Sequence, residues 1–232
     1  MNRAKLILAT TALVISCAAS AQNLDDDRLY GKWGATAEER ASNIGASNFL
    51  KEALECKDYA DATVYFQQLL RNCPGASMAI FSRGIMLYKN RINRANNMED
   101  KRRLTDSLML IYDMRNLYFG NNEKYGRSYI LDLKARDAIK YCQHDRRFVR
   151  NTLKSAIEAA IEDNRTKTDI IARYFDMLCD DYINDDTITK ELILSEYKKL
   201  SPYFKDVYDE FTLANKSIFE DSFSEWNSKY NM

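Results

Sequence analysis

The chain has 232 residues with 34 basic and 34 acidic side chains, so it lacks the positive excess that a nucleic-acid-binding surface needs. It is long enough to bury a sizeable core, as one elongated domain or as two small ones. Only seven glycines and two prolines occur, and no glycine follows Gly126, so the composition favours an all-α fold over β-sandwiches and doubly wound sheets.

Residues 1–21 have the pattern of a secretory signal peptide, because a short basic segment precedes an apolar run that cannot span a bilayer. Ala19-Ser20-Ala21 predicts cleavage before Gln22. Val14-Ile15-Ser16-Cys17 is a loose lipoprotein pattern that would instead place a lipid on Cys17, but it lacks the usual leucine. We therefore expect an exported chain, periplasmic, secreted or at the cell surface, with lipid attachment to the outer membrane as the alternative.

Residues 22–36 are rich in aspartate and glycine and are expected to form a flexible lead-in. Thr36 and Glu39 have the spacing of a capping box, which predicts a helix over about 37–56. A second helix follows a short turn and is expected to end before Pro74-Gly75, since proline cannot continue a helix that precedes it.

A third helix is expected over about 76–94 and a fourth over about 100–119, where Gly120 provides a common helix terminator. The segment at about 90–102 reads as a basic insertion into the helix pair. Charge runs of this kind are usually solvated loops, and the alternative is a basic loop that faces an acidic or anionic-lipid partner. Residues 37–119 thus form the first part of the helical region.

Residues 120–232 are expected to continue as helical hairpins, with apolar side chains on one face every 3.6 residues over 148–161 and 170–182. Ser201-Pro202 predicts the start of a further helix. A final stripe either caps the fold or forms a partner surface; it comprises Phe219, Phe223, Trp226 and Tyr230. In all we expect about ten helices, stacked as antiparallel pairs in a right-handed α-solenoid.

Part of this pattern fits the 34-residue tetratricopeptide motif, a helix–turn–helix unit. Small residues let two helices approach closely, an aromatic residue fills the wedge between them, and proline ends the pair. These motif positions are held by Tyr59, Ala62, Phe66, Leu69 and Pro74, and by Gly84 in the next unit. The first half of the first unit departs from the motif, with Leu50 in place of glycine and Ala53 in place of tyrosine.

The stretch from Tyr30 to Gly120 also resembles the N-terminal region of a group of exported bacterial tetratricopeptide-repeat proteins of poorly known function. The resemblance lies in residues 34–40, 57–59, 69–77 and 106–109. It implies a periplasmic or surface-facing scaffold and no reaction. Members of that group are usually longer, so the resemblance leaves open a short relative or a truncated one.

The titratable residues do not suggest catalysis, a cofactor or a metal site. His144 is the only histidine, and it follows Cys142 by two residues, a spacing at which helical side chains point apart. Asp180 to Glu191 has the length of a calcium loop but no glycine at its sixth position, which favours a solvated turn. The four cysteines beyond residue 21 lack zinc-site spacing. They are Cys56, Cys73, Cys142 and Cys179, of which the last two are expected to be buried or to form a disulfide.

A peptide-binding groove is one hypothesis for the helix pairs. In the motif register its lining residues are Asn48, Lys51, Glu55, Phe81 and Tyr88. Core packing is the alternative for the two aromatic residues. The sequence thus favours an exported helical-repeat scaffold that binds a protein or peptide, with no transmembrane segment and with homo-oligomers left open. The alternative is a lipid-anchored helical protein that binds a small ligand, glycan or peptide for a nutrient-uptake complex.

Overall fold

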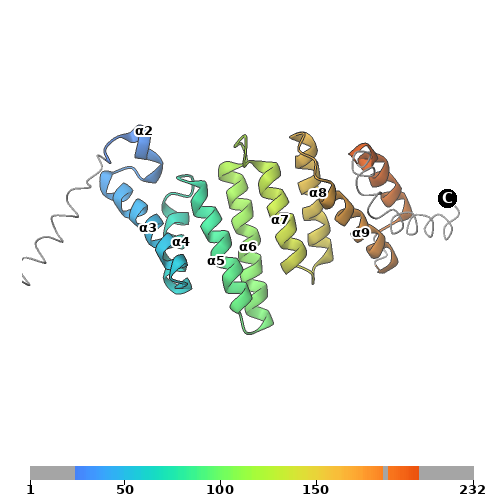
Figure 1. Cartoon of the computed structure of the whole chain (residues 1–232), viewed down its shortest axis with the longest axis horizontal. Coiled ribbons are helices and arrows are strands. Elements are labelled where there is room, and N and C mark those ends of the chain that lie inside the picture. Colours follow the sequence, from blue (N-terminus) through green and yellow to red (C-terminus); the bar gives the residue numbers. More distant parts are fainter. Residues whose placement is uncertain (1–23, 185–187, 204–232) are drawn as a thin grey trace, which may run out of the picture. The chain divides into compact units, whose positions relative to one another are not determined.

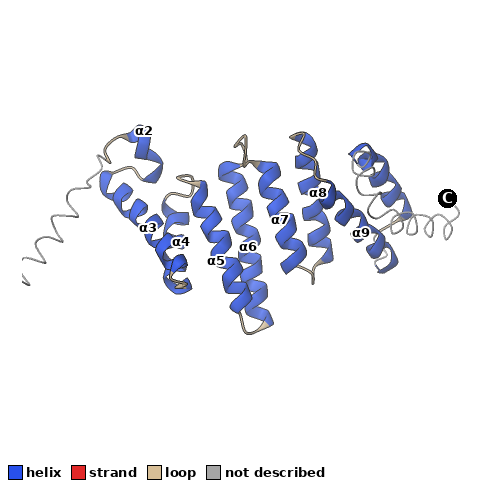
Figure 2. Ribbon diagram, in the orientation of Figure 1, coloured by secondary structure: helices blue, strands red, loops and turns tan. Residues whose placement is uncertain are grey.

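The computed structural model describes residues 24–184 and 188–203, and every regular element among them is helical (Figures 1 and 2). The elements are α2 (Asp27–Tyr30), the 3-10 helix η1 (Gly31–Trp33), α3 (Ala37–Glu55), α4 (Tyr59–Asn72), α5 (Met78–Arg94), α6 (Met98–Phe119), α7 (Arg127–Tyr141), α8 (Arg146–Glu162) and α9 (Thr168–Asn184). Residues 190–203 are also helical. The all-α prediction is confirmed for this part of the chain, whereas the signal peptide and the stripe from Phe219 to Tyr230 lie outside it.

Two compact units divide the chain, unit 1 up to Ile111 and unit 2 from Tyr112 onward, so that α6 contributes to both. In unit 1 α3 packs on α4, and both contact α5. In unit 2 α7 packs on α8, and α8 packs on α9 (Figure 1). Within each unit, therefore, helices that follow one another in the chain pack as neighbours, as the sequence predicts.

Side-chain caps fix where the first helices begin. The predicted capping box is confirmed: Thr36 Oγ1 accepts from the Glu39 N–H at 3.2 Å, and Glu39 Oε2 accepts from the Thr36 N–H at 3.4 Å. Ser77 caps α5 by accepting from the Ala79 N–H at 3.2 Å, so this helix begins at Met78, two residues later than expected. Each cap satisfies backbone donors that a helix start leaves without an intrahelical acceptor.

The segment at about 90–102, which was expected to contain a solvated loop, is mostly helical. α5 continues to Arg94 and α6 begins at Met98, which leaves residues 95–97 as the connection. Asn97 explains this early start of α6. Its side-chain oxygen accepts from the Asp100 N–H at 2.7 Å, and its amide donates to Asp100 Oδ2 at 2.8 Å. Most residues of this segment thus belong to the end of α5 or the start of α6.

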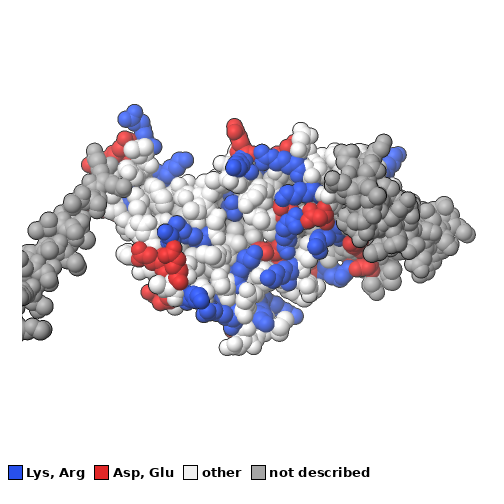
Figure 3. Space-filling view, viewed as in Figure 1, with Lys and Arg blue, Asp and Glu red and all other residues white. Residues whose placement is uncertain are grey.

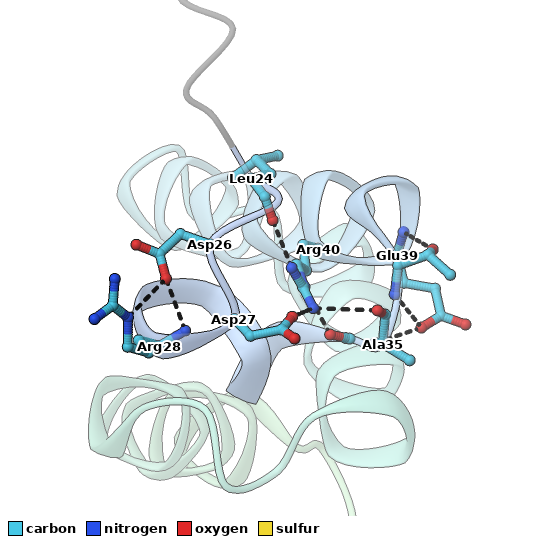
Figure 4. Close-up of polar contacts among 9 residues, drawn as sticks. Leu24, Asp26, Asp27, Arg28, Ala35, Glu39 and Arg40 are labelled. Atoms are coloured by element: carbon cyan, nitrogen blue, oxygen red, sulfur yellow. Dashed lines mark hydrogen bonds and ion pairs between the residues drawn. The ribbon is translucent and has the colours of Figure 1, made fainter.

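The expected flexible lead-in is also corrected, because its residues from 24 onward are held against α3 by Arg40 (Figure 4). The Arg40 guanidinium is buried and donates to the backbone oxygens of Leu24 at 2.7 Å and Gly34 at 2.8 Å. It also donates to the Ala35 carbonyl at 3.1 Å and pairs with the Asp27 carboxylate. A guanidinium offers five donors in a fixed plane, which lets one side chain donate to several backbone carbonyls of a loop.

The core of unit 1 contains the close helix contact that the repeat motif predicts. Ala62, Phe66 and Leu69 of α4 are buried, and a Cβ added at Gly84 of α5 would lie 2.2 Å from Phe66 Cζ. Any side chain at residue 84 would therefore overlap the Phe66 ring. The absence of a side chain at Gly84 is what lets the ring occupy the space between α4 and α5.

In unit 2 the predicted helical faces are confirmed for most of their residues. Val149, Leu153, Ala156 and Ile157 of α8 are buried, and so is the corresponding stripe of α9. That α9 stripe comprises Ile170, Ile171, Tyr174, Phe175 and Leu178.

The helix start predicted at Ser201-Pro202 is wrong, since residues 190–203 form one helical run. The Ser201 hydroxyl donates to the Lys198 carbonyl at 3.2 Å instead of capping a new helix. Lys198 lies four residues before Pro202, whose ring nitrogen has no hydrogen to donate. The hydroxyl thus supplies the hydrogen bond that this carbonyl would otherwise lack.

Candidate binding sites

Three residues of the expected groove share the solvent-exposed face of α3. Asn48, Lys51 and Glu55 are all exposed, and the Lys51 amine lies 3.7 Å from the Glu55 carboxylate as a surface ion pair. Such pairs contribute little to stability because water screens them, so these side chains remain available to a partner. The structure therefore keeps the polar part of the expected groove accessible.

The two aromatic residues of the expected groove are placed differently. Phe81 is completely buried in unit 1, so it lies in the core and its assignment to an accessible groove is wrong. Tyr88 is half-buried and packs edge-on against Phe66, with the ring centroids 6.1 Å apart. The Arg91 guanidinium lies 5.3 Å from the centre of the Tyr88 ring. Phe81 is therefore a core residue, which was the alternative for both aromatic residues, and Tyr88 is only partly packed into the core.

A different pair of aromatic residues is accessible in unit 1, and the sequence analysis missed it. Phe49 of α3 is 50% exposed, and its ring centroid lies 5.4 Å from that of Tyr65 of α4. Gly45 lies one turn before Phe49 and presents no side chain that could cover it. The available signal was local: the residues three and four positions from Phe49 include Gly45 and Glu52, so its helical face is only partly apolar.

Exposed acidic side chains lie one turn from each ring of this aromatic pair. Glu52 lies one turn after Phe49 on α3, and Asp61 lies one turn before Tyr65 on α4; both are exposed. Glu55 and Asp58, at the turn between the two helices, are exposed as well. Figure 3 shows acidic atoms gathered over α3 and α4. We name the surface formed by Asn48, Phe49, Glu52, Asp61 and Tyr65 the α3–α4 surface.

Ion pairs link the helices of unit 2. Asp181 of α9 is 2% exposed and accepts from both Arg146 and Arg150 of α8. Asp181 lies at the start of the segment that has the length of a calcium loop, and its carboxylate is already paired with two arginines. Among the described residues, no cluster of three histidine, cysteine, aspartate or glutamate side chains could hold a metal ion.

A second set of ion pairs connects α7 to α9. Asp132 of α7 accepts from Lys167 at 2.6 Å and from Arg136 at 3.1 Å, and Arg136 also pairs with Asp169 of α9 at 2.8 Å. Acidic and basic side chains interleave over α7 and α8 in Figure 3. The carboxylate of Asp132 is therefore compensated by two cations.

A pocket of about 160 Å³ lies in unit 2 beside this network. Its apolar wall comes from α8 and α9, and its polar wall from the first turns of α7 and from the connections on either side of the α7–α8 pair. The lining residues are Lys124, Ser128, Tyr129, Asp132, Ala156, Ile157, Ala160, Arg165, Thr166, Lys167 and Ile170. Three lysine and arginine side chains against one aspartate give this lining an excess of positive charge.

Two further polar side chains are buried between α6 and α7. The Tyr112 hydroxyl donates to Asp137 Oδ2 at 2.7 Å, and burial followed by this bond raises the tyrosine pKa. The Arg115 guanidinium is buried 5.6 Å from the centre of the Tyr129 ring, and burial lowers its pKa. Among the described residues, Arg115 forms no ion pair, and its Nε has no hydrogen-bond partner.

The thiols and the single histidine take no part in these sites. None of the four cysteines in the described residues is joined in a disulfide, so the Cys142–Cys179 pairing is not formed. Cys73 is buried, which raises its pKa to about 11, whereas Cys56 is exposed. His144 is exposed in the turn that follows α7.

None of the described helices combines the length and apolarity that crossing a membrane would require. Comparisons of the chain with protein-family models, with curated proteins and with solved structures found no match.

Proposed function

We propose that this protein is an exported helical-repeat module that binds a protein partner through the α3–α4 surface and performs no catalysis. The accessible Phe49–Tyr65 pair carries the proposal. Aromatic residues contribute disproportionately to binding energy at protein interfaces, because they bury a large area with little loss of side-chain freedom. Phe49 is 50% exposed and its ring adjoins that of Tyr65, so the two rings together offer aromatic contact area that a partner could cover.

The charges around the pair indicate the chemistry of the partner. Glu52 and Asp61 flank the two rings, and Glu55 and Asp58 lie nearby. A complementary segment would present an apolar side chain to Phe49 and Tyr65, with lysine or arginine residues on either side. Acidic residues at the rim would accelerate association with such a segment and disfavour acidic ones.

A tetratricopeptide-like stacking of helix pairs is part of this proposal. It is supported by the contact between Phe66 and Gly84, which occupy the motif's aromatic and small positions and pack as the motif requires. Stacked pairs of this kind expose extended surfaces and support protein binding more often than chemistry, which is a likeness of fold and not of mechanism.

In-cell photo-crosslinking tests the protein-binding proposal. A photo-reactive amino acid at Asn48, which is exposed next to Phe49, should yield one predominant protein adduct in intact cells. The same probe at Arg102, exposed on α6, serves as the control. Loss of the Asn48 adduct in a Phe49→Ala variant would support the α3–α4 surface. Equal adducts from both positions, or an adduct that Phe49→Ala leaves unchanged, would contradict it.

Export is supported by the composition of residues 1–21, which lie outside the described residues. Mass spectrometry of the mature N-terminus distinguishes the two forms of export. A chain that begins at Gln22, free or cyclised, is the expected result for a protein-binding module. A diacylated Cys17 would favour the second candidate function, a lipid-anchored protein that binds a small ligand.

The pocket in unit 2 is the observation that favours this second candidate. It is lined by residues of three helices and two connections and has an apolar floor with polar groups at one side. Small-molecule sites commonly combine these features.

A further inference from the structure

The polar side of the unit 2 pocket is formed by the first turn of α7, and this turn lacks a side-chain cap. Gly126 occupies the N-cap position and has no side chain to accept a hydrogen bond. The Arg127 N–H donates to the Gly120 carbonyl at 2.8 Å, and the first intrahelical bond is donated by the Ile130 N–H to the Gly126 carbonyl at 2.9 Å. The N–H groups of Ser128 and Tyr129 therefore precede the first intrahelical bond and lack acceptors within the helix.

Glycine is required at the N-cap position because of the loop that precedes it. A Cβ at Gly126 would lie 2.2 Å from the Asn122 carbonyl oxygen and 2.5 Å from that of Gly120. Serine, aspartate or asparagine, the side chains that usually cap a helix, would all clash here. The loop geometry thus leaves the positive end of the α7 dipole open toward the pocket.

Ser128 supplies an observation that is independent of the helix terminus. It lines the pocket and is 4% exposed, and its hydroxyl has no hydrogen-bond partner among the described residues. A buried hydroxyl without a partner costs free energy, so buried polar groups are nearly always hydrogen-bonded to protein, water or ligand. The Ser128 hydroxyl is therefore a hydrogen-bond donor at the wall of the pocket that is not used by the described residues.

The charge of the pocket lining indicates the charge of a ligand group that would accept a hydrogen bond from Ser128. Lys124 and Arg165 are basic and exposed at the rim, and Lys167 is adjacent to them. Arg165 donates to the carbonyls of Lys124 at 3.2 Å and Glu123 at 2.5 Å, which fixes its guanidinium beside the start of α7. The single acid of the lining, Asp132, is neutralised by Lys167 and Arg136. Helix N-termini with nearby cations bind oxyanions.

The apolar walls and the volume of the pocket indicate the size and polarity of the rest of the ligand. Ala156, Ile157 and Ala160 of α8, together with Ile170 of α9, form an apolar floor opposite the first turn of α7. A volume of about 160 Å³ is close to that of a cavity known to hold one benzene ring, roughly 150 Å³. The space therefore suits an oxyanion joined to one small apolar group.

We propose that this pocket binds a small organic anion. Its oxyanion accepts hydrogen bonds from the Ser128 hydroxyl and from the N–H groups at the start of α7, and its apolar part lies on Ile157 and Ile170. Arg165 contributes charge at the rim. This inference rests on the ligand-binding candidate and is independent of the α3–α4 surface, so either can fail while the other holds.

Calorimetric titration of the full mature chain tests the proposal with matched probes. Benzoate and phenyl phosphate carry the two common oxyanions, benzamide is the neutral counterpart of benzoate, and inorganic phosphate lacks the apolar part. At least one organic anion should bind with a Kd of about 1 mM or tighter and about tenfold more tightly than benzamide and inorganic phosphate. Whether benzoate or phenyl phosphate binds better distinguishes carboxylate from phosphoryl ligands.

Two variants and a control connect binding to the pocket. Ser128→Ala should weaken binding of the better organic anion about tenfold, as expected for one hydrogen bond to a charged group. It should not lower the Tm of the ligand-free chain, because it removes an unpartnered hydroxyl. Arg165→Gln should weaken binding and its dependence on salt. Arg102→Gln, which removes an exposed arginine of unit 1, should change neither.

Three results would overturn the proposal: no binding of either organic anion at about 1 mM, equal binding of benzamide, or a Ser128→Ala variant with unchanged affinity. If Ser128→Ala fails to fold, the Arg165→Gln variant tests the proposal instead. The Arg165 side chain is exposed, so its replacement leaves the core intact. Unchanged affinity and salt dependence in that variant would likewise contradict the proposal.

Discussion

At the scale of single residues, Gly84 determines how closely α4 and α5 pack. Glycine inside a helix costs about 1 kcal/mol relative to alanine, so a compensating contact is expected, and the Phe66 ring provides it. Because Phe66 is fully buried, its ring cannot move away from an added methyl group. Gly84→Ala should therefore destabilise the protein by about 1–3 kcal/mol in urea unfolding followed by circular dichroism.

Gly45→Ala is the matched control for this substitution. Gly45 also lies inside a helix, but the nearest atom to an added Cβ is a Phe49 ring carbon at 3.9 Å, an ordinary contact distance. The substitution should stabilise the protein by about 0.5–1 kcal/mol through the loss of backbone freedom in the unfolded chain. Opposite signs at the two glycines are expected, and equal signs would contradict the packing described for Phe66.

The thiols provide a second prediction at this scale. Burial raises the pKa of Cys73 from 9.0 to about 11, which lowers its thiolate fraction at about pH 8 by roughly a hundredfold. Cys56 is exposed. Iodoacetamide at about pH 8 should modify Cys56 well before Cys73, as peptide mapping by mass spectrometry would measure. In denaturant the two rates should converge, and a fast reaction of Cys73 in the native state would contradict its burial.

At the scale of elements, Arg40 holds the segment that precedes α3. Replacement by glutamine should free residues 24–35, because one amide cannot reproduce the bonds to Leu24, Gly34 and Ala35 together with the pair to Asp27. Hydrogen exchange should increase in α2 and η1 and remain unchanged in α4. Arg28→Gln is the control, since the Arg28 side chain is 92% exposed. Protection that persists in Arg40→Gln would show that other contacts hold the segment.

The start of α6 gives a pH dependence. A side-chain hydrogen bond from Asn97, followed by one from Arg103, lowers the pKa of Asp100 below 3.8. Because its pKa is depressed in the folded state, the ionised carboxylate stabilises the fold at pH values above the carboxylate's ordinary pKa. This stabilisation is lost as the pH falls through the folded-state pKa. Asp100→Asn should therefore lower the Tm at about pH 6, with the difference from wild type shrinking below about pH 3.8.

Asp106→Asn is the control for this measurement, since Asp106 is exposed on the same helix. It should leave the Tm nearly unchanged at both pH values. A Tm difference for Asp100→Asn that stays constant as the pH falls would contradict the stabilising role of its carboxylate.

The helices were largely predictable from the sequence because their signals are local. Thr36 and Glu39 mark a helix start by spacing alone, and the 3.6-residue pattern locates the buried face of α8. The wrong predictions depended on interactions that residue spacing does not reveal. Arg40 orders the lead-in through carbonyls distant in the sequence, whereas the Ser201 hydroxyl donates to the Lys198 carbonyl three residues earlier in the same helix.

The candidate sites were harder to predict for the same reason. Phe49 of α3 and Phe81 of α5 both fall on first helices in the motif register, and only packing decides that Phe81 is buried while Phe49 is exposed. The pocket is formed by residues from α7, α8 and α9 and two connections, whose proximity no sequence spacing reports. Its most informative feature, the unpartnered Ser128 hydroxyl, becomes visible only once the neighbouring atoms are placed.

At the scale of the whole molecule, each unit has its own buried contacts. Asp181 is 2% exposed, and removing its charge would break the buried ion pair with the Arg150 guanidinium. Asp181→Asn should cost about 3 kcal/mol, measured as faster hydrogen exchange in α8 and α9. Exchange in α3 and α4, which belong to unit 1, should change little.

Asp180→Asn is the control for Asp181, since its side chain is 67% exposed and its closest contact to Arg146 is 3.6 Å. It should cost less than about 0.5 kcal/mol. Equal effects of the two substitutions would contradict the central role of Asp181 in unit 2.

The central claim is that the α3–α4 surface binds a protein partner. The most direct test is the Kd of the crosslinked partner for the wild-type chain and for Phe49→Ala, with Met98→Ala, at a more exposed apolar side chain, as the control. Loss of an aromatic anchor typically costs about 2 kcal/mol, so the account predicts a Kd about 30-fold higher for Phe49→Ala and unchanged for Met98→Ala. An unchanged Kd for Phe49→Ala would contradict it.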